Sequence, residues 1–184
     1  MPPTCFDVLD RHVIGGGADR VALTGAGKSW TYARLLEEVA AFGGVLRHCG
    51  VVPGDRVVLA LPAVPEAAVA LLACARIGAT HDLVDPTTRS LGDPAKVLVT
   101  ASTETYVAVA LERDAGVADV VLVKQRDGTA WTLVDGRDYD WDVVMRAGRT
   151  DPVPWVAGST ITPYDEQTAA WVQPLLDGRT LDLG

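Results

Sequence analysis

The segment from Arg56 to Ile77 constrains the fold more than any other part of the chain. It opens with RVVLAL, a continuous apolar run of strand length, which is typical of a strand covered on both faces. Pro65 favours a first helical turn, and the alanine- and leucine-rich stretch after it is apolar nearly all round and ends at Gly78. Because neither element has a polar face, we expect both in the interior of an α/β domain.

Weaker strand and helix signals repeat on both sides of this segment. From Thr31 to Gly50 apolar residues recur three and four apart, which predicts an amphipathic helix with Thr31 as its N-cap. A further helix is expected over residues 104–113, and strand-like runs lie at residues 80–84, 96–100 and 119–124. Strands that alternate with helices favour a doubly wound, mostly parallel α/β sheet with helices on both faces.

The run TGAGKS, residues 24–29, has two interpretations. It follows a strand and precedes a helix, as a P-loop does, but a P-loop needs a glycine at the position of Ala22. As part of a β-hairpin, VALTGAGKSWTY uses the same glycines to turn the chain between two strands. We favour the hairpin, placed ahead of the first amphipathic helix.

Composition excludes several classes of function. The formal charge is -8 and the basic residues are scattered singly, so we expect neither nucleic acid nor a membrane as a partner. The N-terminus has no signal-peptide pattern, and the longest apolar run is about half of what a membrane span needs. The three cysteines are widely spaced and no residue set has metal-ligand spacing. We expect a cytoplasmic protein with reduced thiols, without a metal or a cofactor.

Two long stretches, SWTYARLLEEVAAFGGVLRHCGVVPGDRVVLALP and PEAAVALLACARIGATH, carry a resemblance to known proteins. The first resembles the opening of enzymes of the adenylate-forming, or AMP-binding, superfamily, which contains the acyl-CoA synthetases. The second resembles the acetyl- and propionyl-CoA synthetases in particular. The next residues, DLVDPTT, look more like the amino-acid-adenylating branch. KVLVTAS resembles a parallel strand of the family, and YDWDVVMRAGRTDPVP resembles the segment ahead of its phosphate loop. The resemblance covers roughly residues 8–154 and implies the family's α/β fold.

The chain departs from the family pattern at two places. Between Pro86 and Lys96 the family has a helix, whereas this chain has only TTRSLGDPA, so we expect that helix to be shortened or lost. After Pro154 the family has a Thr/Ser/Gly-rich loop that binds ATP phosphates, and this chain offers only GSTITP. We therefore expect a family-like subdomain over residues 1–154, truncated before the ATP site, and an irregular C-terminal tail over residues 155–184 that packs on the domain or on a partner.

The best candidates for catalysis are His81, Asp82 and Asp85. They lie at the carboxyl end of a predicted parallel strand, where open α/β sheets bind ligands. An imidazole beside carboxylates can act as a general base at neutral pH. The alternative is structural: Asp85 caps a turn, Asp82 is solvated, and His81 only follows the family pattern.

Three functions fit these observations. The first is an accessory domain that cannot form adenylates alone and binds an acyl-CoA or a carrier-protein-bound acyl group in a small-molecule pathway. The second is an enzyme that condenses, cyclises or hydrolyses an activated acyl intermediate without ATP, with the strand-end residues as acid and base. The third is one half of a split acyl-CoA synthetase. In each case we expect a second copy of the chain or a partner protein to cover the apolar surface at the boundary.

Overall fold

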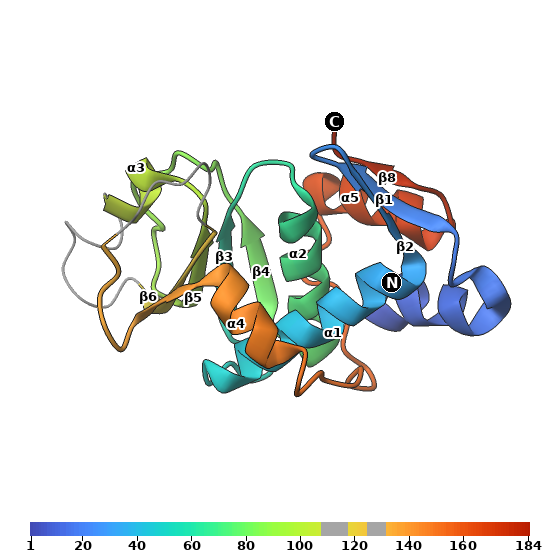
Figure 1. Ribbon diagram of the computed structural model, residues 1–184, viewed down its shortest axis with the longest axis horizontal. Helices are drawn as coiled ribbons and strands as arrows, with labels where there is room; N and C mark the ends of the chain where they lie inside the picture. The colour runs from blue at the N-terminus through green and yellow to red at the C-terminus, as the bar shows by residue number, and fades with distance from the viewer. Residues whose placement is uncertain (108–117, 125–131) are drawn as a thin grey trace.

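The computed structural model describes residues 1–107, 118–124 and 132–184. The chain begins with two short π-helical turns and continues through alternating strands and helices (Figure 1). The elements are η1 (Phe6–Asp10), η2 (Val13–Gly17), β1 (Val21–Gly25), β2 (Lys28–Thr31), α1 (Tyr32–His48), β3 (Arg56–Ala60), α2 (Pro65–Ile77), β4 (Thr80–Leu83), β5 (Ala95–Thr100), α3 (Thr103–Thr105), β6 (Ala118–Val123), β7 (Asp138–Asp140), α4 (Trp141–Gly148), α5 (Glu166–Leu176) and β8 (Leu181–Asp182).

The described strands form two sheets. The larger has five parallel strands in the order β4-β3-β5-β6-β7, and the smaller has the order β2-β1-β8. Along β3 the side chains alternate: Val57 and Leu59 belong to the main core with residues of α1, α2 and α4, whereas Val58 and Ala60 belong to a second core with Tyr106. The predicted doubly wound α/β sheet, covered on both faces, is confirmed.

The buried strand and helix predicted from residues 56–77 are present as β3 and α2. Pro65 occupies the first turn of α2, and most of the helix is buried. Gly78 ends it with a left-handed φ of 80°, a conformation that glycine adopts without steric cost.

The hairpin interpretation of residues 24–29 is confirmed. β1 and β2 are antiparallel, with Gly25 opposite Lys28, and both turn residues have positive φ, 50° at Ala26 and 70° at Gly27. Two left-handed residues define the tight turn that suits a twisted hairpin. The run therefore forms a turn between strands and lacks the geometry of a phosphate loop.

The first amphipathic helix also matches its prediction, because α1 begins after Thr31 and the Thr31 hydroxyl accepts a hydrogen bond from Arg34 N at 3.2 Å. Residues 84–94 contain no helix, as the shortened segment there predicted. The helix predicted at residues 104–113 begins as α3, and residues 108–117 lie outside the described part of the chain.

The segment after Pro154, which we expected to be irregular, contains a helix and a strand. α5 runs from Glu166 through Pro174 to Leu176, and β8 pairs in parallel with β1. Pro174 has no N–H to donate within the helix. The last turn is held instead through Leu175, whose side chain is buried in the core and whose carbonyl accepts from the Tyr32 hydroxyl at 3.1 Å. The domain boundary near residue 154 stays a prediction.

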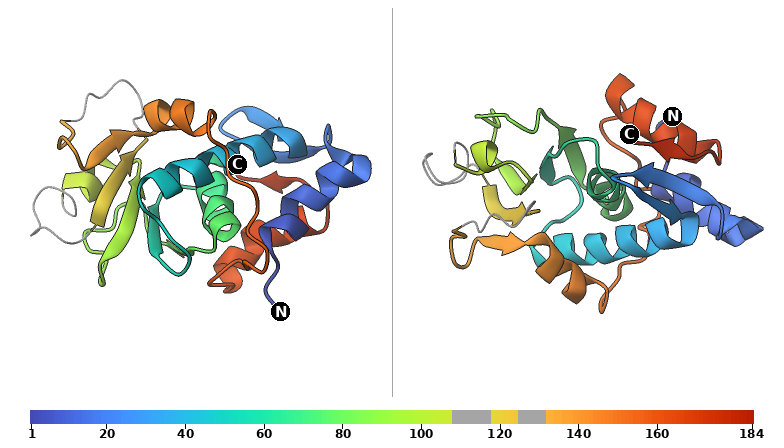
Figure 2. Two further views of the ribbon diagram at one scale, coloured as in Figure 1. Left: turned by 90° about the horizontal axis from the view of Figure 1, so that it is seen from below. Right: turned by 45° about the horizontal axis from the view of Figure 1, so that its top comes forward.

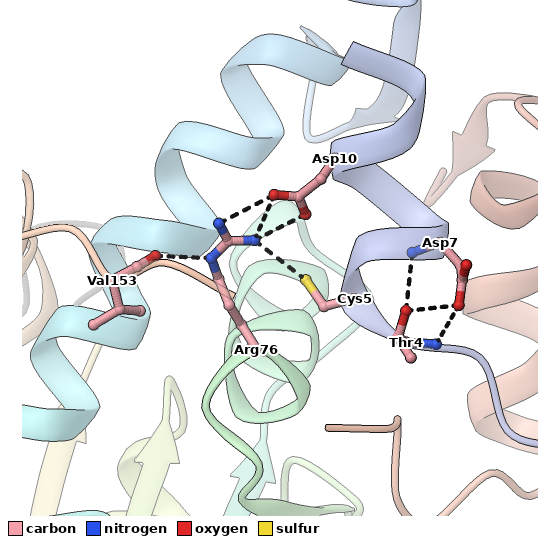
Figure 3. A network of polar contacts seen from close by, with 6 residues as sticks. All are labelled: Thr4, Cys5, Asp7, Asp10, Arg76 and Val153. Atoms are coloured by element: carbon pink, nitrogen blue, oxygen red, sulfur yellow. Dashed lines mark hydrogen bonds and ion pairs between the residues drawn. The ribbon is translucent and has the colours of Figure 1, made fainter. Parts of the chain in front are cut away.

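An arginine near the end of α2 ties three distant segments together (Figure 3). Arg76 forms a bidentate ion pair with Asp10 of η1, at 2.9 Å for the closest N–O pair, and its Nε donates to Val153 O at 2.9 Å. The Cys5 thiol lies 3.8 Å from the same guanidinium, and burial raises its pKa to about 12. Because Arg76 is nearly buried, this network fixes η1 and the chain around Val153 against α2.

Candidate functional site

The carboxyl ends of the parallel strands define the edge where a ligand is expected. The chain passes from β3 to β4 on one side and from β5 through β6 to β7 on the other, so the strand order reverses between β3 and β5. Open α/β sheets bind ligands outside the carboxyl ends of the strands at such a point. Here the edge is formed by the chain after Leu61, by Ser102 and Thr103 after β5, and by Lys124 after β6.

The cation at this edge is already paired. Lys124 Nζ lies 2.7 Å from Asp142 Oδ1 and 3.7 Å from Glu66 Oε1. These carboxylates occupy the first turns of α4 and α2, where they interact favourably with the helix dipoles. Lys124 therefore joins the ends of two helices to β6, and its charge is matched locally by acidic groups.

Hydroxyl groups link the loops that leave β4 and β5. Ser102 Oγ accepts a hydrogen bond from Thr105 N at 3.3 Å and so caps α3. Thr105 Oγ1 in turn donates to Pro86 O at 2.7 Å. Thr103 lies between them and is exposed. The rim, meaning the loops at the carboxyl ends of β3 and β5 where the strand order reverses, is therefore a polar, solvent-accessible surface fixed by these hydrogen bonds.

His81 is enclosed between β4 and α5. Its side chain is completely buried, and its Nε2 lies 3.1 Å from Thr168 Oγ1. Burial lowers the pKa of His81 to about 4, against a smaller opposing effect of the Asp165 and Asp82 carboxylates. The imidazole is therefore neutral at physiological pH and holds the C-terminal helix to the sheet.

The two aspartates have separate partners. Asp82 lies next to His81 in β4, so its side chain is on the opposite face of the sheet, and its Oδ2 accepts from Arg56 Nε at 2.6 Å. Asp85 is exposed and accepts from Thr87 N at 2.7 Å, and hydrogen bonds from Thr87 lower its pKa. Asp85 thus caps a turn, whereas Asp82 is ion-paired and not merely solvated.

The structure does not bring His81, Asp82 and Asp85 together into one cluster. Their catalytic role stays a prediction, and the enclosed imidazole does not favour it. Among the described residues there is no group of His, Cys, Asp and Glu that could hold a metal ion. The part of the chain that the structure describes also has no helix long and apolar enough to cross a membrane.

Sequence reasoning missed an apolar cavity on the amino side of the sheet. It has a volume of about 320 Å³ and lies between the end of α1, α4 and strands β6 and β7. The sequence gives only a weak sign of it, the pair of small residues Ala147 and Gly148 that end α4. Its lining residues are Val45, His48, Cys49, Val120, Tyr139, Val144, Ala147 and Gly148.

The fold agrees with comparisons to known proteins. Residues 10–166 match the AMP-binding enzyme family, and the chain belongs to that family. Within it, the chain is 36% identical over 171 residues to an acetyl-coenzyme A synthetase of Mycolicibacterium smegmatis, a match covering 81% of this chain and 18% of that protein. It is 37% identical over 158 residues to an acetyl-coenzyme A synthetase of Streptomyces coelicolor, covering 74% of this chain and 24% of the relative.

A human relative extends the same similarity. The mitochondrial acyl-CoA synthetase short-chain family member 3 is 35% identical over 175 residues, which cover 82% of this chain and 26% of that protein. The chain therefore matches about a fifth to a quarter of the length of these curated relatives. The expected resemblance to the acyl-CoA synthetases is confirmed.

Proposed function

We propose that these residues form an acyl-binding domain of the acyl-CoA synthetase type that does not itself make adenylates. Its ligand is an acyl group carried by coenzyme A or by a carrier protein. The names of the similar acetyl-coenzyme A synthetases support this ligand class. After Pro154, where the resemblance leads us to expect a Thr/Ser/Gly-rich phosphate loop, the chain has GSTITP, and this supports the lack of adenylation.

The observation that carries the proposal is the fold of the segment after Pro154. Where the family resemblance leads us to expect a phosphate loop, the chain forms α5 and β8, whose Val172, Leu175 and Leu181 are buried in the main core. Thr168 contacts His81, and Arg11 donates to Leu176 O. A segment held by these contacts is not free to wrap around the phosphates of ATP.

The rim between β3 and β5 is the site we propose for the acyl carrier. It lies at the point where the strand order reverses, which is the expected ligand position in this class of sheet. Ser102 and Thr105 already hold the loops that form it. The acyl-bearing end of coenzyme A or of a carrier protein can therefore bind to a rim that needs little rearrangement.

The first test is ATP–pyrophosphate exchange with acetate or propionate by the purified chain. We expect no exchange above a protein-free control. Exchange by this chain alone would refute the proposal. Exchange that appears only after a second protein with the phosphate loop is added would support the split synthetase instead.

The second test is titration calorimetry with acetyl-CoA, which compares two tryptophan substitutions. T103W places a bulky side chain on the proposed rim, whereas V52W places one at an exposed site before β3, at the opposite edge. We expect at least a tenfold weaker affinity for T103W and an unchanged affinity for V52W. Equal effects, or no binding by the wild type, would refute the rim as the site.

Light scattering of the same samples tests the predicted homodimer.

A further inference from the structure

We infer that the cavity between α1, α4, β6 and β7 is a second binding site, for a small uncharged apolar molecule. It lies at the edge of the sheet formed by the amino ends of the strands, because α1 ends there and the chain then enters β3. It is therefore separate from the strand-end rim and does not depend on the function proposed for that rim.

The lining favours an uncharged ligand. Val45, Val120 and Val144 supply apolar walls, and among the described lining residues there is no Lys, Arg, Asp or Glu. Burial raises the pKa of the Cys49 thiol to about 11, against a smaller opposing effect of Lys96, so the thiol is neutral. A charged ligand would lose hydration here without gaining a partner of opposite charge.

Few polar groups face the cavity. The Tyr139 hydroxyl already donates to Gly136 O at 3.2 Å. His48 is exposed at the rim, where its imidazole can form one hydrogen bond with a polar end of the ligand. The ligand should thus be apolar along most of its length, with no more than one hydroxyl or N–H group near the opening.

The cavity is held open by close contact between the two helices beside it. A Cβ on Gly148 would come within 2.4 Å of Ala41 O, so the backbones of α4 and α1 already touch there. Nearby, the rings of Phe42 and Trp141 are stacked with centroids 4.4 Å apart. Because these contacts fix the distance between the helices, α4 cannot collapse into the space, and the site exists before a ligand arrives.

The volume limits the size of the ligand. At about 320 Å³ the cavity is at the lower end of the range for small-molecule sites, roughly 300–1,000 Å³. It fits a short aliphatic chain or a single aromatic ring system. We therefore choose indole and 1-hexanol as neutral probes, and hexanoate as an anion of matched length.

Cysteine alkylation offers a local readout. The chain has three cysteines, of which Cys5 and Cys74 are completely buried and Cys49 is partly accessible in the cavity wall. Under native conditions N-ethylmaleimide should therefore add one label, at Cys49. We expect saturating indole or 1-hexanol to slow this labelling at least tenfold, and hexanoate to leave it unchanged. Labelling that neither neutral probe slows, or that hexanoate slows equally, would overturn the inference.

Two variants on α4 separate binding from a general effect on the fold. A147F fills the cavity from its accessible wall, whereas V143F adds the same ring at a neighbouring residue that is 53% exposed. Binding is measured by saturation-transfer NMR with indole, a readout that does not need Cys49. We expect the transfer signal to be lost in A147F and kept in V143F while both variants retain the wild-type melting temperature. An equal signal in both variants would place indole elsewhere and refute the site.

Discussion

Acidification should destabilise the protein through one buried imidazole. His81 has a folded-state pKa of about 4, compared with an ordinary value of 6.5. Between these values the unfolded chain binds a proton at His81 and the folded chain does not, so stability rises with pH and is lost as pH falls. At 1.36 kcal/mol per pKa unit, the full loss from this group is about 3 kcal/mol.

Urea denaturation, followed by tryptophan fluorescence at several values between about pH 7 and pH 4.5, measures this loss. We expect the wild-type free energy of unfolding to fall by about 2 kcal/mol over this range through His81. The non-titrating variant H81Q should remove most of that dependence, although its stability at neutral pH will be lower if the contact with Thr168 is weakened.

A second histidine provides the control for this series. H48Q replaces an exposed imidazole on α1 and shows the effect of a histidine-to-glutamine change outside the core. Burial also lowers the pKa of His12, so this group contributes in the same direction and its contribution remains in H81Q. If H81Q retains the full wild-type slope, His81 is not the group that links acid to unfolding, and the account of how α5 is held would be wrong.

Three further predictions concern stability and are checked by the same urea titration. A26G relieves the left-handed φ of 50° in the hairpin turn and should raise stability by about 0.5–1 kcal/mol; a loss would contradict the turn geometry. R76M removes the cation from the partly buried carboxylate of Asp10 and should cost up to about 3 kcal/mol, and the double variant R76M/D10N should recover part of this loss. G148A places a methyl group against Ala41 O and should cost roughly 1–3 kcal/mol through overpacking; a neutral result would show that the helices can separate.

The sequence predicted well those features that depend on neighbouring residues. The all-round apolar character of residues 56–77 requires burial on every side, and β3 and α2 are accordingly central. Thr31 and Gly78 mark helix ends through local backbone chemistry, so their positions were predicted closely. The missing helix at residues 84–94 follows from a stretch too short and too rich in turn residues to form one.

Features that depend on distant residues could not be predicted in the same way. His81 and Thr168 are 87 positions apart in the chain, and no local pattern predicts that their side chains will be in contact. Proline disfavours helical continuation, yet α5 passes through Pro174 to Leu176, because contacts with distant residues such as Tyr32 outweigh that local preference. The cavity is a property of how α1 and α4 cross, which depends on packing and not on periodicity.

The pairing of the first and last segments has a consequence for folding during synthesis. Figure 2 shows α5 beside the N-terminal turns, and the guanidinium groups of Arg11 and Arg20 donate to carbonyls 165 and 158 residues further along the chain. As the ribosome releases the chain from its N-terminus, these two guanidinium groups lack their carbonyl acceptors until Leu176 and Gly178 have left the exit tunnel. The contacts of the N-terminal turns with α5 therefore form last, whereas Asp10 of η1 can pair with Arg76 once α2 has been made.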